Sequence, residues 1–481
     1  MTNSDAERLE EERELAELEA RYDAGRGLVR KNGAHGLGHS SPRFAELLLR
    51  RNRPGDADTA APVLERVLDG QIRSPDADRG RFPMLVPESW RDLNGTLFAL
   101  PALVSAIEEH ASRLPPALIA RIEDALRLAT PAVESRWQDE VFDLHRDFAA
   151  YSNVFVLYIQ ALVLLARHFR DDRLWSVAAG QWRRWFNQVS YYGIAEFLSP
   201  NYNHLIARAL LRMQPLVPNP DWAGEVARAL EYLMALQCAM HHPALGLPIV
   251  GVSRDYRNFA TPGRGGFRPI MTGMAERYAP AAVWAEYCNR RYPHRAEGRA
   301  GLTPFRFSTW QMWDQGLGSM TGGHYFPQQL HLVAAAGRSP EDRAVAFLDA
   351  APNLINGWVA QRDGRALCLF ARTGMSYRHT QLRERIMTEP APRSRPPALG
   401  LAGDWAVEMG AGGGSDFARM GSPCASARLN SAMAASARTD GSRVRSRSAK
   451  PRFAPTAPRT MPCTRVVSSS GYRTPLRRRR Q

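Results

Sequence analysis

The sequence predicts a mainly α-helical protein in which antiparallel helical hairpins close into a ring, followed by a short β-hairpin and a disordered tail. Two observations support this fold class. The segment 149–169 is apolar on nearly every side, as a helix packed on both faces must be, whereas 172–190 carries apolar residues on one face. Short polar turns join such helices, so neighbours must lie antiparallel. Inner helices that alternate with outer helices are typical of hairpins arranged around a centre.

The N-terminal region, residues 1–40, is predicted to be a charged helix near 5–21 followed by a glycine-rich linker. Leu9, Leu15 and Leu18 give this helix only a thin apolar edge, which favours a surface helix or a contact with a partner. The first residues are charged and contain no apolar signal core. The sequence as written therefore predicts a cytoplasmic protein.

Residues 41–355 are predicted to form the ring. Capping residues mark its turns, because Asp171 or Asp172 can begin one helix and Asp221, after a group of prolines, can begin another. The richest apolar window, 154–166, is too short to span a bilayer, so no membrane contact is expected. The helices are expected near residues 43–52, 62–69, 94–112, 115–129, 149–169, 172–190, 203–214, 221–240 and 275–289.

The C-terminal half of the chain changes character twice. Residues 241–273 are rich in glycine and proline and are predicted to be an ordered crossing loop. Residues 356–385 begin a β-region, because apolar residues alternate on both sides of an Arg-Asp-Gly turn. Residues 386–481 contain few large apolar side chains and cannot offset the entropy of folding, which predicts a disordered basic tail. Two origins of the tail stay open: a natural extension, or a frameshift that has replaced a β-domain by out-of-frame translation.

Charge and cysteine usage exclude some classes of function. Most of the formal charge of +15 lies in the tail, and residues 1–385 are close to neutral, so nucleic-acid binding is not predicted for the folded part. A natural tail would bind nucleic acid only nonspecifically, through salt-dependent contacts. The five cysteines are widely spaced and lie in no Cys/His cluster, so no disulfide framework, metal site or cofactor is expected. The oligomeric state is not indicated.

Part of the chain resembles a known group of proteins. An apolar helix begins with Tyr-x-Asn at 151–153, and 193–202 reads Gly-Ile-x-Glu-Phe-x-Ser-Pro-x-Tyr. DLNGTLFAL at 92–100 and GVSRDY at 251–256 are similar in kind. These motifs resemble bacterial α/α-toroid, or six-hairpin, carbohydrate-active proteins. The resemblance implies an incomplete ring of hairpins, often followed by a β-sandwich, with polysaccharide lyases and glycoside hydrolases as known activities and many uncharacterised members. The sequence departs from a full lyase because it contains no readable β-sandwich.

The residue types needed for elimination at a uronate lie around the helix expected near 203. The reaction needs a group that neutralises the carboxylate, a base, and an acid for the leaving oxygen. We expect Tyr202 or His204 to act as base and acid. Asn201 and Arg254 would hold the carboxylate, with Tyr256 beside them. Each residue of the 201–204 group also has a structural explanation, because the asparagine can cap the helix, the tyrosine can pack and the histidine can be hydrogen bonded in the first turn.

Four further residues are candidates for substrate binding. Tyr151 and Asn153 begin the most apolar helix, where their polar ends can face the mouth of the ring or simply cap the helix. His241 follows a helix end, where a cation would complement the helix dipole, and Trp313 completes the set. Glu196 is the best carboxylate for hydrolysis, because its aromatic neighbours would raise its pKa.

The leading prediction is a carbohydrate-active protein that acts on a polysaccharide or oligosaccharide by β-elimination at a uronate residue. The first alternative is a glycoside hydrolase that uses a carboxylate pair including Glu196. The second is a non-catalytic helical scaffold or sugar-binding protein, whose N-terminal helix and arginine-rich tail recruit partners. Absorbance of an unsaturated product would separate elimination from hydrolysis, and the absence of both activities would leave the scaffold.

Overall fold

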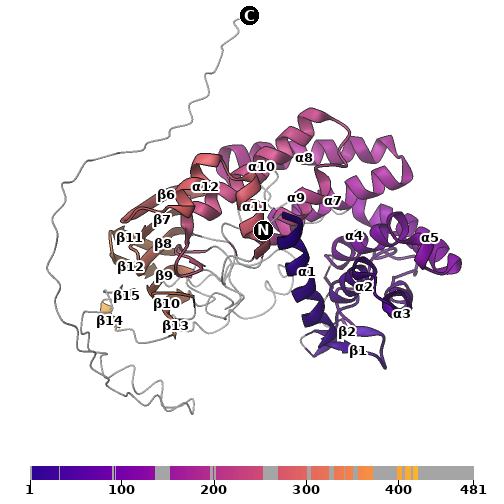
Figure 1. Cartoon of the computed structure of the whole chain (residues 1–481), viewed down its shortest axis with the longest axis horizontal. Coiled ribbons are helices and arrows are strands. Elements are labelled where there is room, and N and C mark those ends of the chain that lie inside the picture. The colour runs from indigo at the N-terminus through magenta and orange to yellow at the C-terminus, as the bar shows by residue number, and fades with distance from the viewer. Residues whose placement is uncertain are drawn as a thin grey trace, which may run out of the picture. The chain divides into compact units, whose positions relative to one another are not determined.

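A computed structural model describes most of the chain up to residue 420 (Figure 1). Helices occupy more than half of the described residues, which confirms the prediction of a mainly helical protein. The description covers residues 3–31, 33–88, 91–92, 94–135, 152–194, 199, 202–252, 269–300, 305–323, 330–340, 342–349, 356–371, 398–402, 407–412 and 415–420.

The helices follow one another along the first part of the chain, as Figure 1 shows. Pro280 divides the helix predicted at 275–289 into two, because proline lacks the N–H that a continuing helix requires. The helices are α1 (Asn3–Glu19), α2 (Ser40–Arg51), α3 (Asp56–Asp69), α4 (Gly95–Glu108), η1 (Ala111–Arg113), α5 (Pro116–Glu134), α7 (Ser152–Phe169), α8 (Asp172–Tyr192), α9 (Asn203–Met213), α10 (Pro220–Met240), α11 (Pro269–Tyr278) and α12 (Ala281–Cys288).

Contacts between helices follow a regular order. Each of α2, α4, α7, α9 and α11 packs against the next helix of the chain, which is α3, α5, α8, α10 and α12 respectively. The first members also contact one another, because α2 touches α4, α4 touches α7, and α7 touches α9. From α10 the contacts continue to α11, from α11 to α1, and from α1 back to α2. The sequence of contacts therefore returns to the helix at which it began.

The burial of α7 and α8 follows the pattern of their sequences. α7 is buried on every side from residue 152 to residue 166. It is long and apolar enough to cross a membrane, but 83% of that stretch is buried inside the protein, as in a core helix. Each large apolar side chain removed from water contributes about 1.5–3 kcal/mol. α8 buries one face, which consists of Leu174, Ala178, Trp182, Trp185 and Val189.

Side-chain caps fix where two of the helices begin. The carboxylate of Asp171 accepts hydrogen bonds from the backbone N–H groups of Arg173 and Leu174 at 2.9 and 3.0 Å, which confirms it as the N-cap of α8. At α10 the cap is Asn219 and not the predicted Asp221, whose backbone N–H donates to the Asn219 side chain at 2.7 Å. The intervening proline explains the shift, because proline is favoured at the first helical position.

The N-terminal helix α1 is part of the packed protein, so the prediction of an isolated surface helix is wrong. Leu15 and Leu18 are each 4% exposed, and α1 contacts both α2 and α11. The predicted linker also contains structure: residues 22–35 form three short antiparallel strands, β1 (Tyr22–Asp23), β2 (Leu28–Lys31) and β3 (Ala34–His35). The thin apolar edge of α1 suffices because its glutamates pair with arginines of other helices.

An antiparallel sheet of ten strands follows the helices. It begins at His294, well inside the range 41–355 that the sequence assigns to helices, and that assignment is therefore corrected for 294–349. Of the predicted tail, β13, β14 and β15 are described and residues 421–481 lie outside the described part. The strands are β6 (His294–Ala300), β7 (Phe305–Gln311), β8 (Gln315–Gly323), β9 (Leu330–Gly337), β10 (Arg343–Asp349), β11 (Asn356–Arg362), β12 (Arg365–Ala371), β13 (Ala398–Ala402), β14 (Val407–Gly412) and β15 (Ser415–Met420).

The order of strands in this sheet is β13-β10-β9-β8-β11-β12-β15-β14, with β7 pairing to both β6 and β8. β11 pairs with β12 from Asn356↔Ala371 to Arg362↔Arg365 around a two-residue turn, in which Asp363 has φ 52°. The sequence analysis predicts none of the strands β6 to β10; among these, β8 and β9 are rich in glycine, alanine and serine and β6 is polar. Such residues gain their preference for strands from the packing around them and not from intrinsic propensity.

The segment after α10 packs against the sheet. Its two short strands, β4 (His241–His242) and β5 (Leu247–Pro248), pair with each other, and Ile249 joins a second apolar cluster with Phe307 and Val333. The backbone of Ile249 lies so close to β8 that a Cβ atom on Gly318 would stand 2.2 Å from its carbonyl carbon. Glycine is required there because no side chain fits between the two backbones.

Candidate functional site

Only part of the predicted catalytic group lies in the described residues. Tyr202 is the N-cap residue of α9 but makes no capping hydrogen bond with its side chain. His204 is half-buried in the first turn of α9. The two are therefore neighbours at the N-terminal end of one helix, as predicted. Outside the described residues lie Tyr151, Glu196, Asn201, Arg254 and Tyr256.

Asn203, which lies between Tyr202 and His204, was not predicted to be functional. Its side chain is 4% exposed, and neither its amide oxygen nor its amide nitrogen has a hydrogen-bond partner among the described residues. A buried amide that leaves both groups unpaired costs about 1–3 kcal/mol for each group, and a bound polar ligand would remove this cost. The only signal in the sequence is the repeated asparagine in Asn-Tyr-Asn-His.

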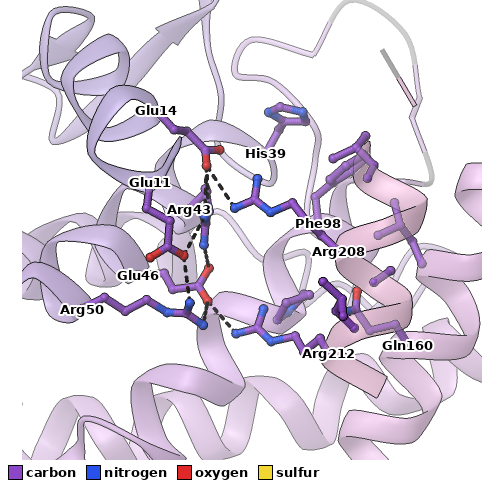
Figure 2. A pocket seen from close by; sticks show the side chains of 15 residues that line it. Glu11, Glu14, His39, Arg43, Glu46, Arg50, Phe98, Gln160, Arg208 and Arg212 are labelled. Atoms are coloured by element: carbon purple, nitrogen blue, oxygen red, sulfur yellow. Dashed lines mark hydrogen bonds and ion pairs between the residues drawn. The ribbon is translucent and has the colours of Figure 1, made fainter. Parts of the chain in front are cut away.

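A charged cavity of about 370 Å³ lies next to this end of α9 in the chain and is lined by α1, α2, α4, α7 and α9 (Figure 2). Leu205, the residue after His204, is part of its wall. Cavities of this size are suited to small ligands. The charged residues of the wall, called the ion cluster below, are Glu11, Glu14, Arg43, Glu46, Arg50, Arg208 and Arg212.

Glu46 is the most deeply buried acid of the ion cluster, at 2% exposure. Its carboxylate pairs with Arg43 at 2.8 Å, Arg50 at 3.1 Å and Arg212 at 2.5 Å. Burial alone would raise the pKa of Glu46, but the guanidinium groups of Arg212, Arg43 and Arg50 together hold it well below its usual value. Glu46 is therefore ionised, and its charge is compensated from three sides.

Two glutamates of α1, Glu11 and Glu14, extend the network toward α2 and α9 (Figure 2). Glu11 pairs with Arg43 at 3.3 Å and with Arg50 at 2.9 Å. Glu14 pairs with Arg43 at 3.0 Å and with Arg208 at 3.1 Å. Burial would raise the pKa of Glu14, but Arg208 and Arg43 lower it to about 2. Neither Glu14 nor Glu46 can therefore donate a proton near neutral pH.

His39 borders the cavity as a neutral side chain. Burial lowers its pKa to about 3, and the nearby charge of Lys31 acts in the same direction. Its ring lies 4.7 Å from the ring of Phe98, which also lines the cavity, and its Nδ1 is 3.1 Å from the hydroxyl of Ser40. The cavity thus combines fixed charges with one neutral imidazole and an aromatic surface.

The remaining predicted binding residues do not line this cavity. Asn153 is 1% exposed in the first turns of α7, and Trp313 is 56% exposed in the turn between β7 and β8. His241 is 2% exposed, and its Nδ1 lies 2.9 Å from the hydroxyl of Tyr287. Burial, followed by the charge of Arg290, lowers its pKa to about 3, so the expectation of a cation at this helix end is wrong.

These two histidines predict that stability falls steeply in mild acid. The unfolded chain binds protons at His39 and His241 below the usual pKa of 6.5, whereas the folded protein does not until about 3. The unfolded state then binds more protons, so the free energy of unfolding decreases as pH falls through this window. Thermal unfolding between pH 7.5 and 4.5 should show a falling Tm, and a His39→Asn, His241→Asn double variant should flatten the slope. A constant Tm in the parent protein would contradict the prediction.

The sequence contains one signal for the ion cluster. Glu46 interrupts the buried run Phe-Ala-Glu-Leu-Leu-Leu of α2, with Arg43 and Arg50 one turn away on either side. Arg208 and Arg212 stand one turn apart on α9, so they share a face. An acid inside an apolar run indicates a buried charge that needs partners. The sequence alone did not indicate which distant helices supply them.

Comparison with protein-family models, with curated proteins and with solved structures finds no match for this chain, so its function is inferred from its own residues.

Proposed function

We propose that this chain is an α/α-toroid protein that binds an acidic polysaccharide or oligosaccharide and cleaves it by β-elimination at a uronate residue. The order of helix contacts, which returns from α11 through α1 to α2, supports the toroid. The cavity supports it too, because its wall comes from α2, α4, α7 and α9, the first members of successive hairpins, together with α1. A toroid of hairpins would enclose its centre with the same helices.

The buried amide of Asn203, which has no hydrogen-bond partner among the described residues, is the observation on which the proposed activity rests. It lies between the candidate base and acid, Tyr202 and His204, in the first turn of a helix whose following residues line the cavity. An amide that is desolvated and unpaired is prepared to bind a polar group of a substrate without first breaking a bond within the protein. The sequence assigns the substrate carboxylate to Asn201 and Arg254. We propose that Asn203 also donates a hydrogen bond to this carboxylate.

The reaction divides into two proton transfers and one bond cleavage. A base, Tyr202 or His204, removes the proton α to the uronate carboxylate, and the electron pair forms a carbon–carbon double bond. The glycosidic oxygen on the adjacent carbon leaves and takes a proton from the other residue of the pair. Hydrogen bonds from Asn203 to the carboxylate stabilise the negative charge that develops on it. No oxidant or metal is consumed.

Hydrolysis finds less support in the described residues. A glycosidase requires one protonated carboxyl group as its general acid. The pKa values of Glu14 and Glu46 are lowered, so neither can serve in that role near neutral pH. Glu196, the acid proposed from the sequence, lies outside the described residues.

The activity is tested by incubating the full chain with alginate, chondroitin, heparin and pectin. Elimination yields an unsaturated uronate whose ultraviolet absorbance rises with time, whereas hydrolysis yields reducing ends without that chromophore. We expect absorbance and reducing ends to increase together on at least one uronate polymer and neither to increase on neutral glucans. Reducing ends without absorbance would contradict elimination. No increase of either signal on any of the four polymers would contradict the proposed cleavage activity.

A further inference from the structure

The ion cluster carries an unbalanced charge. Among the described residues its four arginines face three glutamates, which leaves a formal surplus of one positive charge in this part of the cavity wall. The neighbouring His39 does not change this count, because burial keeps it neutral. Each arginine has a carboxylate partner, but the cluster as a whole carries more positive than negative charge, and a bound anion would balance it. One surplus charge corresponds to one singly charged group.

The surplus is not shared equally among the four arginines. Within the described residues, Arg43 pairs with three carboxylates and Arg50 with two. Arg208 pairs with Glu14 alone, and Glu14 is itself shared with Arg43. Arg212 also has one partner, Glu46 at 2.5 Å, which it shares with Arg43 and Arg50. Arg208 and Arg212 are therefore the guanidinium groups with the fewest carboxylate partners among the described residues.

The electrostatics of the arginines agree with this distribution of partners. Burial, followed by repulsion from Arg43, lowers the pKa of Arg208 in spite of its contact with Glu14. The pKa of Arg43 is raised instead, because Glu46 and Glu14 outweigh its burial. A second anion beside Arg208 would relieve the repulsion between the two guanidinium groups.

The surroundings of Arg208 suit a sugar acid. Figure 2 shows Arg208 directed toward Glu14, at the end of the cavity where His39 also lies, while Glu46, Arg50 and Arg212 occupy the other end. The ring of Phe98 beside His39 offers an apolar face, and Arg208 follows His204 by one helical turn on α9. A carboxylate bound at Arg208 would thus lie on the same side of α9 as a candidate catalytic residue.

We propose that Arg208 binds the carboxylate of one uronate residue, and that Glu14 is the internal carboxylate with which this ligand competes. The choice of a sugar acid rests on the proposed function, but binding requires no catalysis. A planar guanidinium forms paired hydrogen bonds to a carboxylate, which makes it selective for this group over a neutral hydroxyl. Glu14 keeps Arg208 oriented when the ligand is absent. When the ligand is present, Glu14 lowers its affinity by competing for the same guanidinium group.

The test measures binding to the full chain without turnover. Thermal unfolding is followed with sodium glucuronate, with sodium galacturonate, and with glucose plus sodium chloride at the same ionic strength. We expect a concentration-dependent rise in Tm with at least one uronate and none with glucose, because a ligand that binds only the folded state stabilises it by mass action. An equal rise with sodium sulfate at matched ionic strength would overturn the assignment to a sugar carboxylate.

Removal of Arg208 and removal of Glu14 should change uronate binding in opposite directions. Arg208→Gln leaves three arginines facing three glutamates, so it should fold with an unchanged or higher Tm and bind uronate about tenfold more weakly or worse. Arg208→Lys should keep part of the affinity, because it retains the charge but not the paired hydrogen bonds. Glu14→Gln should lower the Tm of the free protein and tighten uronate binding, because the competing carboxylate is gone. Arg73→Gln, which removes an exposed pair with Asp124, is the matched control and should leave binding unchanged.

The outcomes separate this proposal from the proposed activity. If Arg208→Gln binds uronate as tightly as the parent protein, the site is wrong even where elimination is observed. If uronate stabilises the parent protein and not Arg208→Gln while all four polymers stay intact, the site stands and the elimination activity fails. If no uronate changes the Tm of the parent protein or of Glu14→Gln, the proposal is overturned.

Discussion

Replacing Tyr202 by Phe or His204 by Asn is expected to reduce kcat on a uronate polymer by about 10²–10⁴-fold, the usual contribution of a general base or acid. Both substitutions keep the size of the side chain and remove the group that transfers a proton. KM should change little, since neither residue is assigned to hold the carboxylate. The rate is measured from the absorbance of the unsaturated product, over a range of pH, so that each variant reveals which limb of the pH profile its residue controls.

His168→Asn is the matched control for the histidine. His168 lies at the C-terminal end of α7 and pairs with Glu108 and Glu123 at 3.3 and 2.6 Å. It is not among the residues that line the cavity. It should keep the activity of the parent protein. If Tyr202→Phe and His204→Asn both retain activity within about threefold, the assignment of acid and base is wrong. Unchanged Tm values in the two variants would show that a lost rate is not lost folding.

The second large effect concerns stability. Glu46→Gln is expected to reduce the free energy of unfolding by about 3–5 kcal/mol, because removing one partner of a buried ion pair leaves uncompensated charge. Glu46 is 2% exposed and pairs with Arg43, Arg50 and Arg212, so the variant would leave four arginines facing two glutamates. Urea unfolding gives the free energy, and thermal unfolding gives the shift in Tm.

An exposed ion pair provides the contrast. Asp124→Asn breaks the pair with Arg73 at 2.9 Å, in which both side chains are more than half exposed, and should cost no more than about 1 kcal/mol. Removing Arg212 together with Glu46 should restore part of the stability, because the double variant again has nearly balanced charges. Equal losses in Glu46→Gln and Asp124→Asn, or strictly additive losses in the double variant, would contradict the role given to the ion cluster.

The ion cluster is expected to combine opposite contributions to stability. Glu46 is compensated from three sides and stabilises the junction of α2 and α9, whereas Arg208 has one carboxylate partner, Glu14, and is the group proposed to bind the ligand. Binding sites often contain groups that lower the stability of the free protein, because a ligand that compensates such a group binds more tightly. The sign of the Tm change at each position distinguishes the two roles.

Helices were predictable where periodicity and local capping decide the structure. The apolar residues of α8 recur every three or four positions, and Asp171 caps its first turn with bonds that span two and three residues. These interactions are local, so the sequence contains all of their partners. The strands β8 and β9 depend instead on pairing with neighbouring strands, and their glycine- and alanine-rich sequences show little preference of their own.

The sequence likewise predicts some residues of the candidate site and not others. Tyr202 and His204 could be placed together from the sequence, because they are two residues apart at the start of a helix. Asn203 was overlooked because an asparagine in a first helical turn looks like a cap, and only its burial without partners distinguishes it. The ion cluster could not be predicted, since Glu14 and Arg208 are separated by 194 positions in the chain.

By itself, therefore, the sequence determined the helices, several of their ends, and the pair of residues expected to transfer protons. The tertiary structure decided that α1 is packed, that a sheet begins at His294, and that seven charged residues from three helices share one cavity. The physical reason is one of range. Helical periodicity and capping act over a few residues, whereas burial and charge compensation depend on which distant segments meet, and that is settled only when the chain has folded.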